Sequence, residues 1–159
     1  MQTLFDAATV RGRRYYIKSS FLQGISDGAI DTLVARFSAV PSPLSFMFFQ
    51  QLGNAANRVG AEETAFSHRK ALCEWGCLSS WADAADDGTN IRWTRELAEA
   101  MQPFSAGGAY ITQMGLEDEE GTERIQAAYG PNYQRLAALK QKYDPTNLFR
   151  HNQNIRPTV

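Results

Sequence analysis

The short stretch Tyr110, Ile111, Thr112 and Gln113 carries side chains whose types and spacing could do chemistry. The sequence predicts a strand over residues 109–114, and side chains alternate along a strand, so Tyr110 and Thr112 share a face and could line one ligand. Gln113 could reach that ligand only if the strand ends or bends there. A carboxamide has no accessible proton-transfer pKa, so Gln113 cannot serve as a general base. Tyr110 could equally be an ordinary half-buried aromatic of the strand.

Further polar residues are candidates for binding. His68 lies in a predicted strand, where it could face a substrate pocket or make a structural hydrogen bond. Asn132 falls on the apolar side of a predicted helix, where its amide needs a hydrogen-bonding partner, and it could instead cap or tie a loop. Asn152 and Gln153 follow in a predicted extended tail, where their amides can pair with backbone groups.

Other reactive groups predict no metal site. Cys73 and Cys77 share one face of a predicted strand about 13 Å apart, at ~3.3 Å per residue, which is too far for a disulfide. We expect buried free thiols, and with two histidines in the chain a histidine-rich metal site is excluded. Gly107 and Gly108 lack the spacing of a phosphate-binding loop. The acidic residues 117–120 suit the beginning of a helix, where carboxylates interact well with the helix dipole.

The elements that must position these residues can be read from hydrophobic periodicity. Apolar residues at helical spacing predict one buried stripe of Ile30, Leu33, Val34 and Phe37 on a helix that Ser26 or Asp27 caps. Residues 44–51 are apolar on both faces, as expected for a central strand. The predicted strands are 15–22, 44–51, 66–81 and 109–114, and the predicted helices begin near 27, 89 or 90, 117 and 131. This order predicts an α+β fold, an antiparallel sheet with helices packed on one face.

Size and charge exclude several classes of protein. A chain of 159 residues is one domain's worth, and 43% of its residues are hydrophobic. The formal charge is -1, so the sequence predicts neither nucleic-acid nor membrane binding. The first residues lack the pattern of a secretory signal, and no apolar run approaches the roughly 18 residues that span a bilayer. We expect a soluble, cytoplasmic protein.

The C-terminal residues carry a dense sequence pattern. It comprises Y-G-P-N-Y-Q-R-L at 129–136, K-Y-D-P-T-N-L-F-R at 142–150 and N-Q-N-I at 152–155. This pattern resembles the C-terminal signature of the berberine-bridge-enzyme-like FAD-linked oxidoreductases, and residues 16–22, 41–44 and 65–69 resemble the substrate domain of that family. The resemblance divides the sequence into a lead-in (1–10), a substrate-domain-like region (11–115) and a berberine-bridge-type segment (116–159), with the last two in one compact domain.

The resemblance implies a cofactor and a set of contacts. FAD is the implied cofactor, with Tyr110, Thr112, Asn132, Tyr133, Asn152 and Gln153 as candidate contacts. His68 and Gln113 are implied substrate contacts. Thr112 replaces an asparagine of the family pattern, and Gln113 stands where some members carry a catalytic tyrosine. No catalytic residue is therefore assigned.

The function that this resemblance implies is the C-terminal, substrate-binding part of a flavin-dependent oxidoreductase. The family's FAD-binding domain is not in this sequence, so we expect the chain to be inactive without a separate FAD-binding subunit. The tail from Tyr129 onward would then dock against that cofactor-carrying module. The alternative is a free-standing, non-catalytic binding or oligomerisation domain that retains the family fold and buries the same exposed surface by self-association, for example as a dimer.

Overall fold

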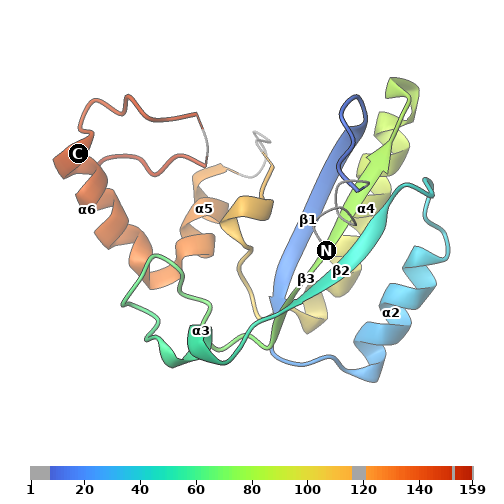
Figure 1. Ribbon diagram of the computed structural model, residues 1–159, viewed down its shortest axis with the longest axis horizontal. Helices are drawn as coiled ribbons and strands as arrows, with labels where there is room; N and C mark the ends of the chain where they lie inside the picture. Colours follow the sequence, from blue (N-terminus) through green and yellow to red (C-terminus); the bar gives the residue numbers. More distant parts are fainter. Residues whose placement is uncertain (1–7, 116–120, 152, 159) are drawn as a thin grey trace.

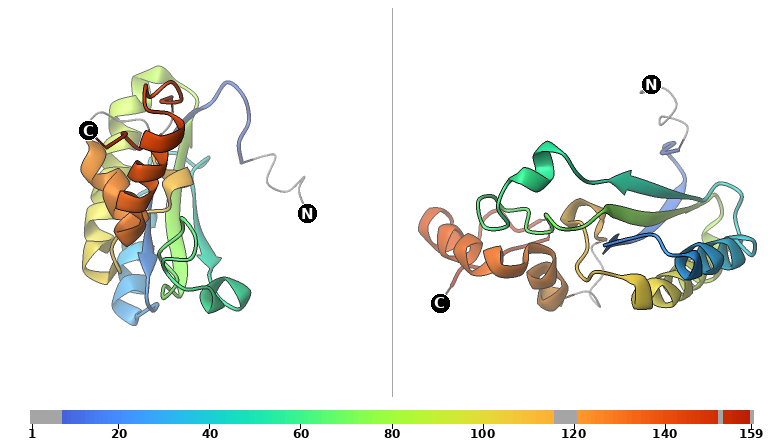
Figure 2. Two further views of the ribbon diagram at one scale, coloured as in Figure 1. Left: turned by 90° about the vertical axis from the view of Figure 1, so that its left-hand side faces the viewer. Right: turned by 90° about the horizontal axis from the view of Figure 1, so that it is seen from below.

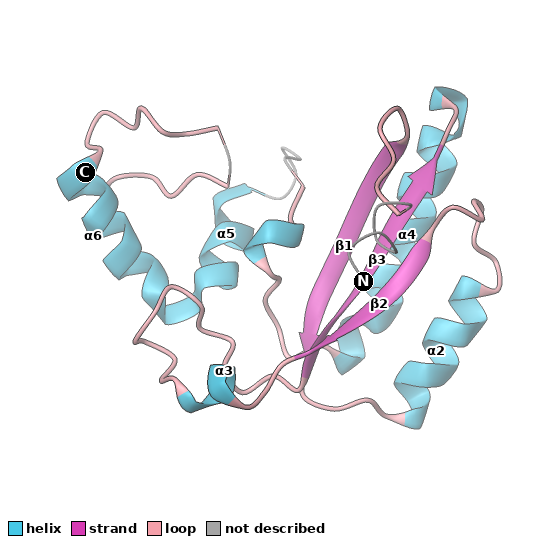
Figure 3. Ribbon diagram, in the orientation of Figure 1, coloured by secondary structure: helices cyan, strands magenta, loops and turns pink. Residues whose placement is uncertain are grey.

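The computed structural model describes residues 8–115, 121–151 and 153–158 and has the α+β fold that the sequence predicts (Figures 1 and 3). Its strands are β1 (Arg14–Leu22), β2 (Phe46–Gln51) and β3 (Cys73–Trp81). Its α-helices are α2 (Asp27–Phe37), α3 (Ala55–Arg58), α4 (Asp87–Met101), α5 (Gly121–Tyr129) and α6 (Tyr133–Tyr143). None of the described helices is both long and apolar enough to cross a bilayer.

The three strands form one antiparallel sheet in the order β1-β3-β2. The prediction of a central strand at 44–51 is therefore wrong, because β2 lies at an edge and β3 lies in the middle. Every residue of β3 except Leu78 is buried, whereas Phe49 of β2 is 47% exposed. The strand predicted over 66–81 begins only at Cys73. Residues 66–70 form a loop that Arg69 ties together by donating to the carbonyl oxygens of Phe66 and Ala56.

Helices α2 and α4 pack on the same face of the sheet, as predicted (Figure 2, right). Odd-numbered residues of β3 point toward these helices and form the main core with them. That core comprises Leu22, Ala29, Leu33, Cys73, Trp75, Cys77, Leu97 and Met101. The even-numbered residues of β3 point to the opposite face, which no described helix covers (Figure 2). We call this surface the helix-free face.

Two helix predictions need correction. Ser26 caps α2 as predicted, since its Oγ accepts a hydrogen bond from Ala29 N, but the predicted buried stripe is only partly buried. Leu33 is 4% exposed, whereas Ile30 is 45% and Val34 is 64% exposed, because Ala29 rather than Ile30 faces the core. The helix predicted to begin at residue 89 or 90 begins at Asp87 as α4. It can begin earlier because the Asn90 amide donates to Asp86 O within the first turn.

Helices α5 and α6 lie beyond β1, on the opposite side from α2 (Figure 1). A second, smaller core of Ala109, Met114 and Ala128 joins α5 to the segment before it. Helix α6 ends at Tyr143, and Asn147 N donates to Asp144 O at 3.0 Å, so residues 144–147 form the turn that the sequence Asp144-Pro145-Thr146-Asn147 predicts. The tail after this turn contains no strand among its described residues. The acidic run at 117–120 lies outside the described part of the chain.

Candidate functional site

The helix-free face holds one buried carboxyl group, that of Glu74 in β3. Its register partners are Phe21 in β1 and Gln50 in β2. The side chain is 0% exposed, and neither carboxylate oxygen has a well-formed hydrogen bond among the described residues. Burial raises the pKa of Glu74, and the nearby Ser19 hydroxyl offsets this only in part. An unpaired buried carboxyl is costly, so it points to chemistry rather than to stability.

A close approach of two strands encloses this carboxyl group. Gly76 follows Glu74 on the same face, and a Cβ atom there would lie 2.3 Å from the Phe48 ring of β2. The tip of the ring can approach the backbone of β3 this closely only because residue 76 is glycine. Phe48 and Phe21 therefore flank Glu74 from the two neighbouring strands and keep water away from it.

Aromatic side chains continue from Phe21 across this end of the helix-free face. The Phe21 ring stacks on His68 with centroids 4.3 Å apart, and it meets Phe66 edge-on at 5.8 Å. Tyr110 packs edge-on against Phe66 at 5.9 Å. The structure thus brings two predicted site residues, His68 and Tyr110, close to Phe21, which is the register partner of Glu74 in β1. We call Phe21, Phe66, His68 and Tyr110 the aromatic cluster.

His68 lies in a loop rather than in the predicted strand, and its ring is held in place. Its Nε2 lies 3.0 Å from Ala128 O, so Nε2 carries the proton and donates it to that carbonyl. Burial lowers the pKa of His68, and the carbonyl oxygens of Ala128 and Ala127 offset this in part. The ring also fills the space above Gly108, where a Cβ atom would lie 2.2 Å from the imidazole. These contacts favour the structural role of His68.

The strand predicted over residues 109–114 is wrong, because Ile111–Gln113 forms a 3₁₀ helix in which Gln113 N donates to Tyr110 O at 2.8 Å. The strand argument that placed Tyr110 and Thr112 on one face therefore does not apply. Thr112 is exposed, and Tyr110 and Gln113 are half-buried. No neighbouring strand pairs with these described residues, so a turn satisfies their backbone groups locally.

Asn132 lies where the sequence predicts, in the apolar interior, and it ties down a loop. It is 4% exposed and donates to Ala61 O at 2.7 Å and to Thr64 O at 2.9 Å. Both amide protons are thereby used. The adjacent Tyr133 is also buried, at the beginning of α6. In this structure Asn132 holds the 61–64 loop against the beginning of α6, which is the loop-tying alternative for this residue.

The C-terminal tail returns to the turn that carries Tyr110. Gln153 Nε2 donates to Met114 O at 2.5 Å, immediately after the 3₁₀ helix. Asn152 lies outside the described residues. The tail also leaves large apolar side chains uncovered, since Tyr143 is 73%, Leu148 is 65% and Phe149 is 78% exposed. The signature segment therefore supports the candidate site from one side and presents an apolar surface on the other.

The turn that carries Tyr110 can be compared with what a flavin would require. Tyr110, Thr112 and Gln113 lie on an accessible turn beside the aromatic cluster, where they could contact a flat ring system. The described residues contain no glycine-rich cradle at a helix N-terminus that would hold the diphosphate of FAD. No group of three or more His, Cys, Asp or Glu side chains among them is placed to hold a metal ion. The described part of the chain therefore offers polar side chains on a turn and no cradle for the phosphates of FAD.

Glu74 is a candidate site residue that the sequence prediction missed. Side chains alternate along the predicted strand 66–81, which puts Glu74 on one face with Leu72 and Leu78. A single carboxylate within an apolar strand was therefore the signal. This signal could be interpreted only with the structure, which shows that β3 is the middle strand and that Phe48 covers this face.

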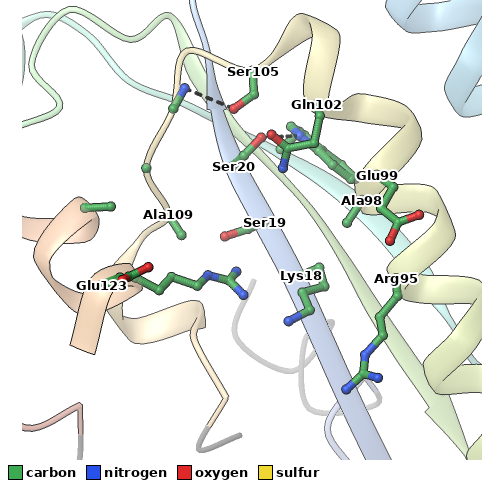
Figure 4. Close-up of a pocket in the computed structure, with 15 residues that line it drawn as sticks. Lys18, Ser19, Ser20, Arg95, Ala98, Glu99, Gln102, Ser105, Ala109 and Glu123 are labelled. Carbon is green, nitrogen blue, oxygen red and sulfur yellow. Dashed lines mark hydrogen bonds between the residues drawn. The ribbon is translucent and has the colours of Figure 1, made fainter. Parts of the chain in front are cut away.

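A groove of about 610 Å³ runs along the outer side of β1 (Figure 4). Lys18 and Ser19 of β1 line one wall, and residues of α4 and α5 line the others. This groove is separate from the aromatic cluster and contains none of the predicted site residues.

Known proteins resemble this chain in sequence and in fold. The family model "Berberine and berberine like" matches residues 111–156. The FAD-linked oxidoreductase YgaK of Bacillus subtilis is 31% identical over 133 residues, covering 84% of this chain and 29% of YgaK. Berberine bridge enzyme-like C-1 of Nicotiana tabacum is 30% identical, covering 94% of this chain and 31% of the relative.

Solved structures agree in fold. The berberine-bridge-enzyme-like protein #28 of Arabidopsis thaliana superposes with a TM-score of 0.81 at 23% identity, over 93% of this chain and 34% of that one. Aclacinomycin oxidoreductase superposes with a TM-score of 0.79 at 25% identity, over 91% of this chain and 33% of that one. The chain spans about a third of the length of the proteins it matches. It belongs to the berberine-bridge-enzyme-like family of FAD-linked oxidoreductases, whose C-terminal part it represents.

Proposed function

We propose that this chain forms the substrate-binding part of a flavin-dependent oxidoreductase and that Glu74 accepts a proton from the substrate. This role requires the Phe21 and Phe48 rings that cover the carboxyl group to move aside when the substrate binds. The observation that carries the proposal is the fully buried, unpaired carboxyl of Glu74 on the helix-free face, flanked by aromatic rings. Relatives named as FAD-linked oxidoreductases support the reaction class. An alcohol or a sugar hydroxyl is the substrate class that fits a single proton acceptor.

The proposed reaction divides two hydrogens of the substrate between two acceptors. Bound FAD would supply the hydride acceptor for the carbon–hydrogen bond that breaks. Glu74 takes the hydroxyl proton as the carbonyl forms, so the substrate loses two electrons and two hydrogens in total. A raised pKa makes Glu74 a stronger base than a solvated carboxylate, which suits proton transfer near neutral pH.

The chain's other residues orient the partners of this reaction. Tyr110, Thr112 and Gln113 would contact the flavin ring from the turn, and the aromatic cluster would pack against the substrate. His68 holds this turn against α5 through Ala128 and through its contact with Gly108. His68 is therefore a positioning residue. The exposed apolar side chains of the tail would dock against the module that binds FAD.

A chimera tests the proposed function. In it, this chain replaces the matched region of Bacillus subtilis YgaK, and the rest of YgaK supplies the FAD-binding part. We expect a yellow protein whose visible flavin absorbance is lost when one member of a panel of sugars and alcohols is added without oxygen. A folded, yellow chimera that no member of such a panel reduces would count against an oxidoreductase role for this chain.

A second candidate function is self-association without catalysis, and the surface of α2 favours it. Ile30 and Val34 form an exposed apolar stripe on this helix, and soluble monomers rarely leave large apolar patches open. If this stripe joins two copies, the purified chain is a dimer by light scattering, and Val34→Glu converts it to a monomer. A wild-type monomer at high concentration contradicts this candidate.

A further inference from the structure

Phe66 lies at the centre of the aromatic cluster. Its ring meets Phe21 edge-on at 5.8 Å and Tyr110 edge-on at 5.9 Å, and its centroid lies 6.1 Å from that of His68. Phe66 therefore contacts each of the other three members. The position of this ring determines the shape of the surface that the cluster presents.

The backbone around Phe66 does not hold this ring in place. Residues 66–70 form a loop, so no strand ladder fixes the direction of the side chain. Phe66 is half-buried and belongs to neither the main core nor the smaller core. An aromatic side chain outside a packed core has more than one staggered rotamer open to it. Its orientation must therefore come from other contacts.

Arg69 supplies contacts to both the ring and the backbone of Phe66. Its guanidinium lies over the Phe66 ring, 4.9 Å from the centroid, which is within the ~6 Å range of cation–π attraction. Its Nε donates to Phe66 O at 3.1 Å. A guanidinium can do both because it is planar, with donors along its edge and a face that stacks on an aromatic ring.

The outer donors of Arg69 connect this contact to the berberine-bridge-type segment. Nη1 donates to Ala56 O at 2.8 Å, and Nη2 donates to Thr64 Oγ1 at 2.5 Å. The backbone oxygen of Thr64 in turn accepts the 2.9 Å hydrogen bond from Asn132. Thr64 thus links the beginning of α6 to Arg69, and Arg69 links it to Phe66. The guanidinium is held on the side away from the ring.

We propose that Arg69 is a positioning residue that fixes the Phe66 ring and thereby determines which substrates the aromatic cluster accepts. Phe21 must move for a substrate to reach Glu74, and the fixed ring of Phe66 forms the wall beside it. The contact of substrate with the cluster rests on the proposed function, whereas the fixing of the ring does not. Loss of the guanidinium should weaken substrate binding more than the reaction itself, because proton transfer to Glu74 does not involve Arg69.

Ring-proton resonances of the chain alone test whether Arg69 fixes the ring. Rings packed edge-on displace each other's proton resonances, so the Tyr110 ring protons report on the Phe66 ring. We expect Arg69→Gln to move these resonances toward their values in the unfolded chain. Arg69→Lys should do the same, because lysine keeps the charge and loses the planar fork. Arg58→Gln, at an exposed position of α3, is the matched control and should leave them unchanged.

A milder variant keeps this test decisive if Arg69→Gln does not fold. Thr64→Val removes only the hydroxyl that accepts from Nη2 and keeps the branched shape of the side chain. It should move the Tyr110 resonances in the same direction by a smaller amount, while the backbone amide resonances of β3 stay in place. Unchanged Tyr110 resonances in a folded Arg69→Gln variant, or in Thr64→Val where Arg69→Gln is unfolded, would overturn the proposal.

Substrate dependence in the YgaK chimera tests whether the fixed ring determines substrate acceptance. The rate of flavin reduction is measured without oxygen against the concentration of the panel member that reduces the wild type. We expect Arg69→Gln to raise the half-saturating concentration at least about five-fold and to change the limiting rate less than about two-fold. Arg58→Gln should change neither value.

Two results of the chimera experiment count against the proposal. A half-saturating concentration that stays the same in Arg69→Gln would overturn the role in substrate acceptance, and so would a fall in the limiting rate alone. A chimera that no substrate reduces is a different result, because it counts against the proposed function. The Tyr110 resonances of the chain alone then decide whether Arg69 fixes the ring.

Discussion

At the scale of single residues, Glu74 accounts for the proposed chemistry at a cost in stability. Its carboxyl lies between Phe21 and Gln50 with no solvent contact, so ionising it in the folded chain is unfavourable. A residue selected for stability alone would be apolar or paired at this position. The same burial that raises its pKa would make it a stronger base in the proposed reaction.

The cost of this carboxyl predicts a specific pH dependence. The pKa of Glu74 is higher in the folded than in the unfolded chain, where it is near 4.5. The folded state therefore binds the proton more tightly, so this group stabilises the chain below pH 4.5 and loses that effect as pH rises through the folded pKa. Glu74→Gln should raise the melting temperature at pH 7 relative to the wild type and not at pH 4. Each unit of pKa difference corresponds to ~1.4 kcal/mol.

Thermal unfolding followed by circular dichroism at both pH values measures this difference. Glu96→Gln, which removes an exposed carboxylate from α4, is the matched control and should show no such pH-dependent gain. Equal melting temperatures of Glu74→Gln and the wild type at pH 7 would contradict the burial of an ionisable carboxyl.

Substitutions at the adjacent glycines Gly107 and Gly108 distinguish the cost of a steric clash with His68 from the cost of backbone strain. A Cβ atom at Gly108 would lie 2.2 Å from the His68 ring, whereas at Gly107 it would meet nothing within 4 Å. Both residues have positive φ angles, so alanine costs about 1 kcal/mol of backbone strain at either position. Gly108→Ala should lose roughly 1–3 kcal/mol more than Gly107→Ala in urea unfolding, because the ring must move. Similar losses for both variants would show that His68 is not held against this backbone.

At the scale of elements, the junction between α6 and the tail depends on Asp144. Its carboxylate accepts hydrogen bonds from Leu148 N at 2.7 Å and Phe149 N at 3.1 Å, and it pairs with Lys140. The hydrogen bond from Lys140 is the main reason that the pKa of Asp144 is lowered, and the two backbone amides add to the effect. This junction fixes the direction in which the exposed Phe149 leaves α6.

Replacing this carboxylate should loosen the tail. An amide side chain cannot pair with Lys140 or accept as strongly, so Asp144→Asn should speed hydrogen exchange at the Leu148 and Phe149 amides about 2- to 10-fold. The lowered pKa means that wild-type protection is present above pH 3.8 and is lost as pH falls through the folded pKa, whereas the variant shows no such step. Asp31→Asn, at an exposed position of α2, is the control and should leave these exchange rates unchanged. Unchanged exchange in Asp144→Asn would contradict the proposed junction.

At the scale of the whole molecule, the sequence predicts individual helices and turns better than it predicts which strands pair with each other. The α+β class, helix α2 with its Ser26 cap and the turn after α6 follow from local signals and are confirmed. Which strand is central depends on pairing between distant residues, and for that reason the prediction for residues 44–51 is wrong. The turn at Ile111–Gln113 was missed for the same reason, since a strand forms only where a partner strand exists.

The candidate site shows the same division. Helical spacing predicts that the Asn132 amide needs a hydrogen-bonding partner, and the structure supplies two carbonyl oxygens. For His68, the structure supports the alternative of a structural hydrogen bond. The sequence could not identify Glu74 as a candidate, because the burial of its carboxyl group depends on Phe48 packing against Gly76. The flavin contacts of Tyr110 and Thr112 stay predictions.

The rate of flavin reduction in the YgaK chimera tests the central claim most directly. With the substrate identified from the panel, single-turnover reduction is followed without oxygen between pH 5 and pH 9 for the wild type, Glu74→Gln and Glu96→Gln. We expect the wild-type and Glu96→Gln rates to rise with pH as Glu74 loses its proton, and the Glu74→Gln rate to be at least about 100-fold lower. A Glu74→Gln chimera that holds flavin and is reduced as fast as the wild type would contradict the account.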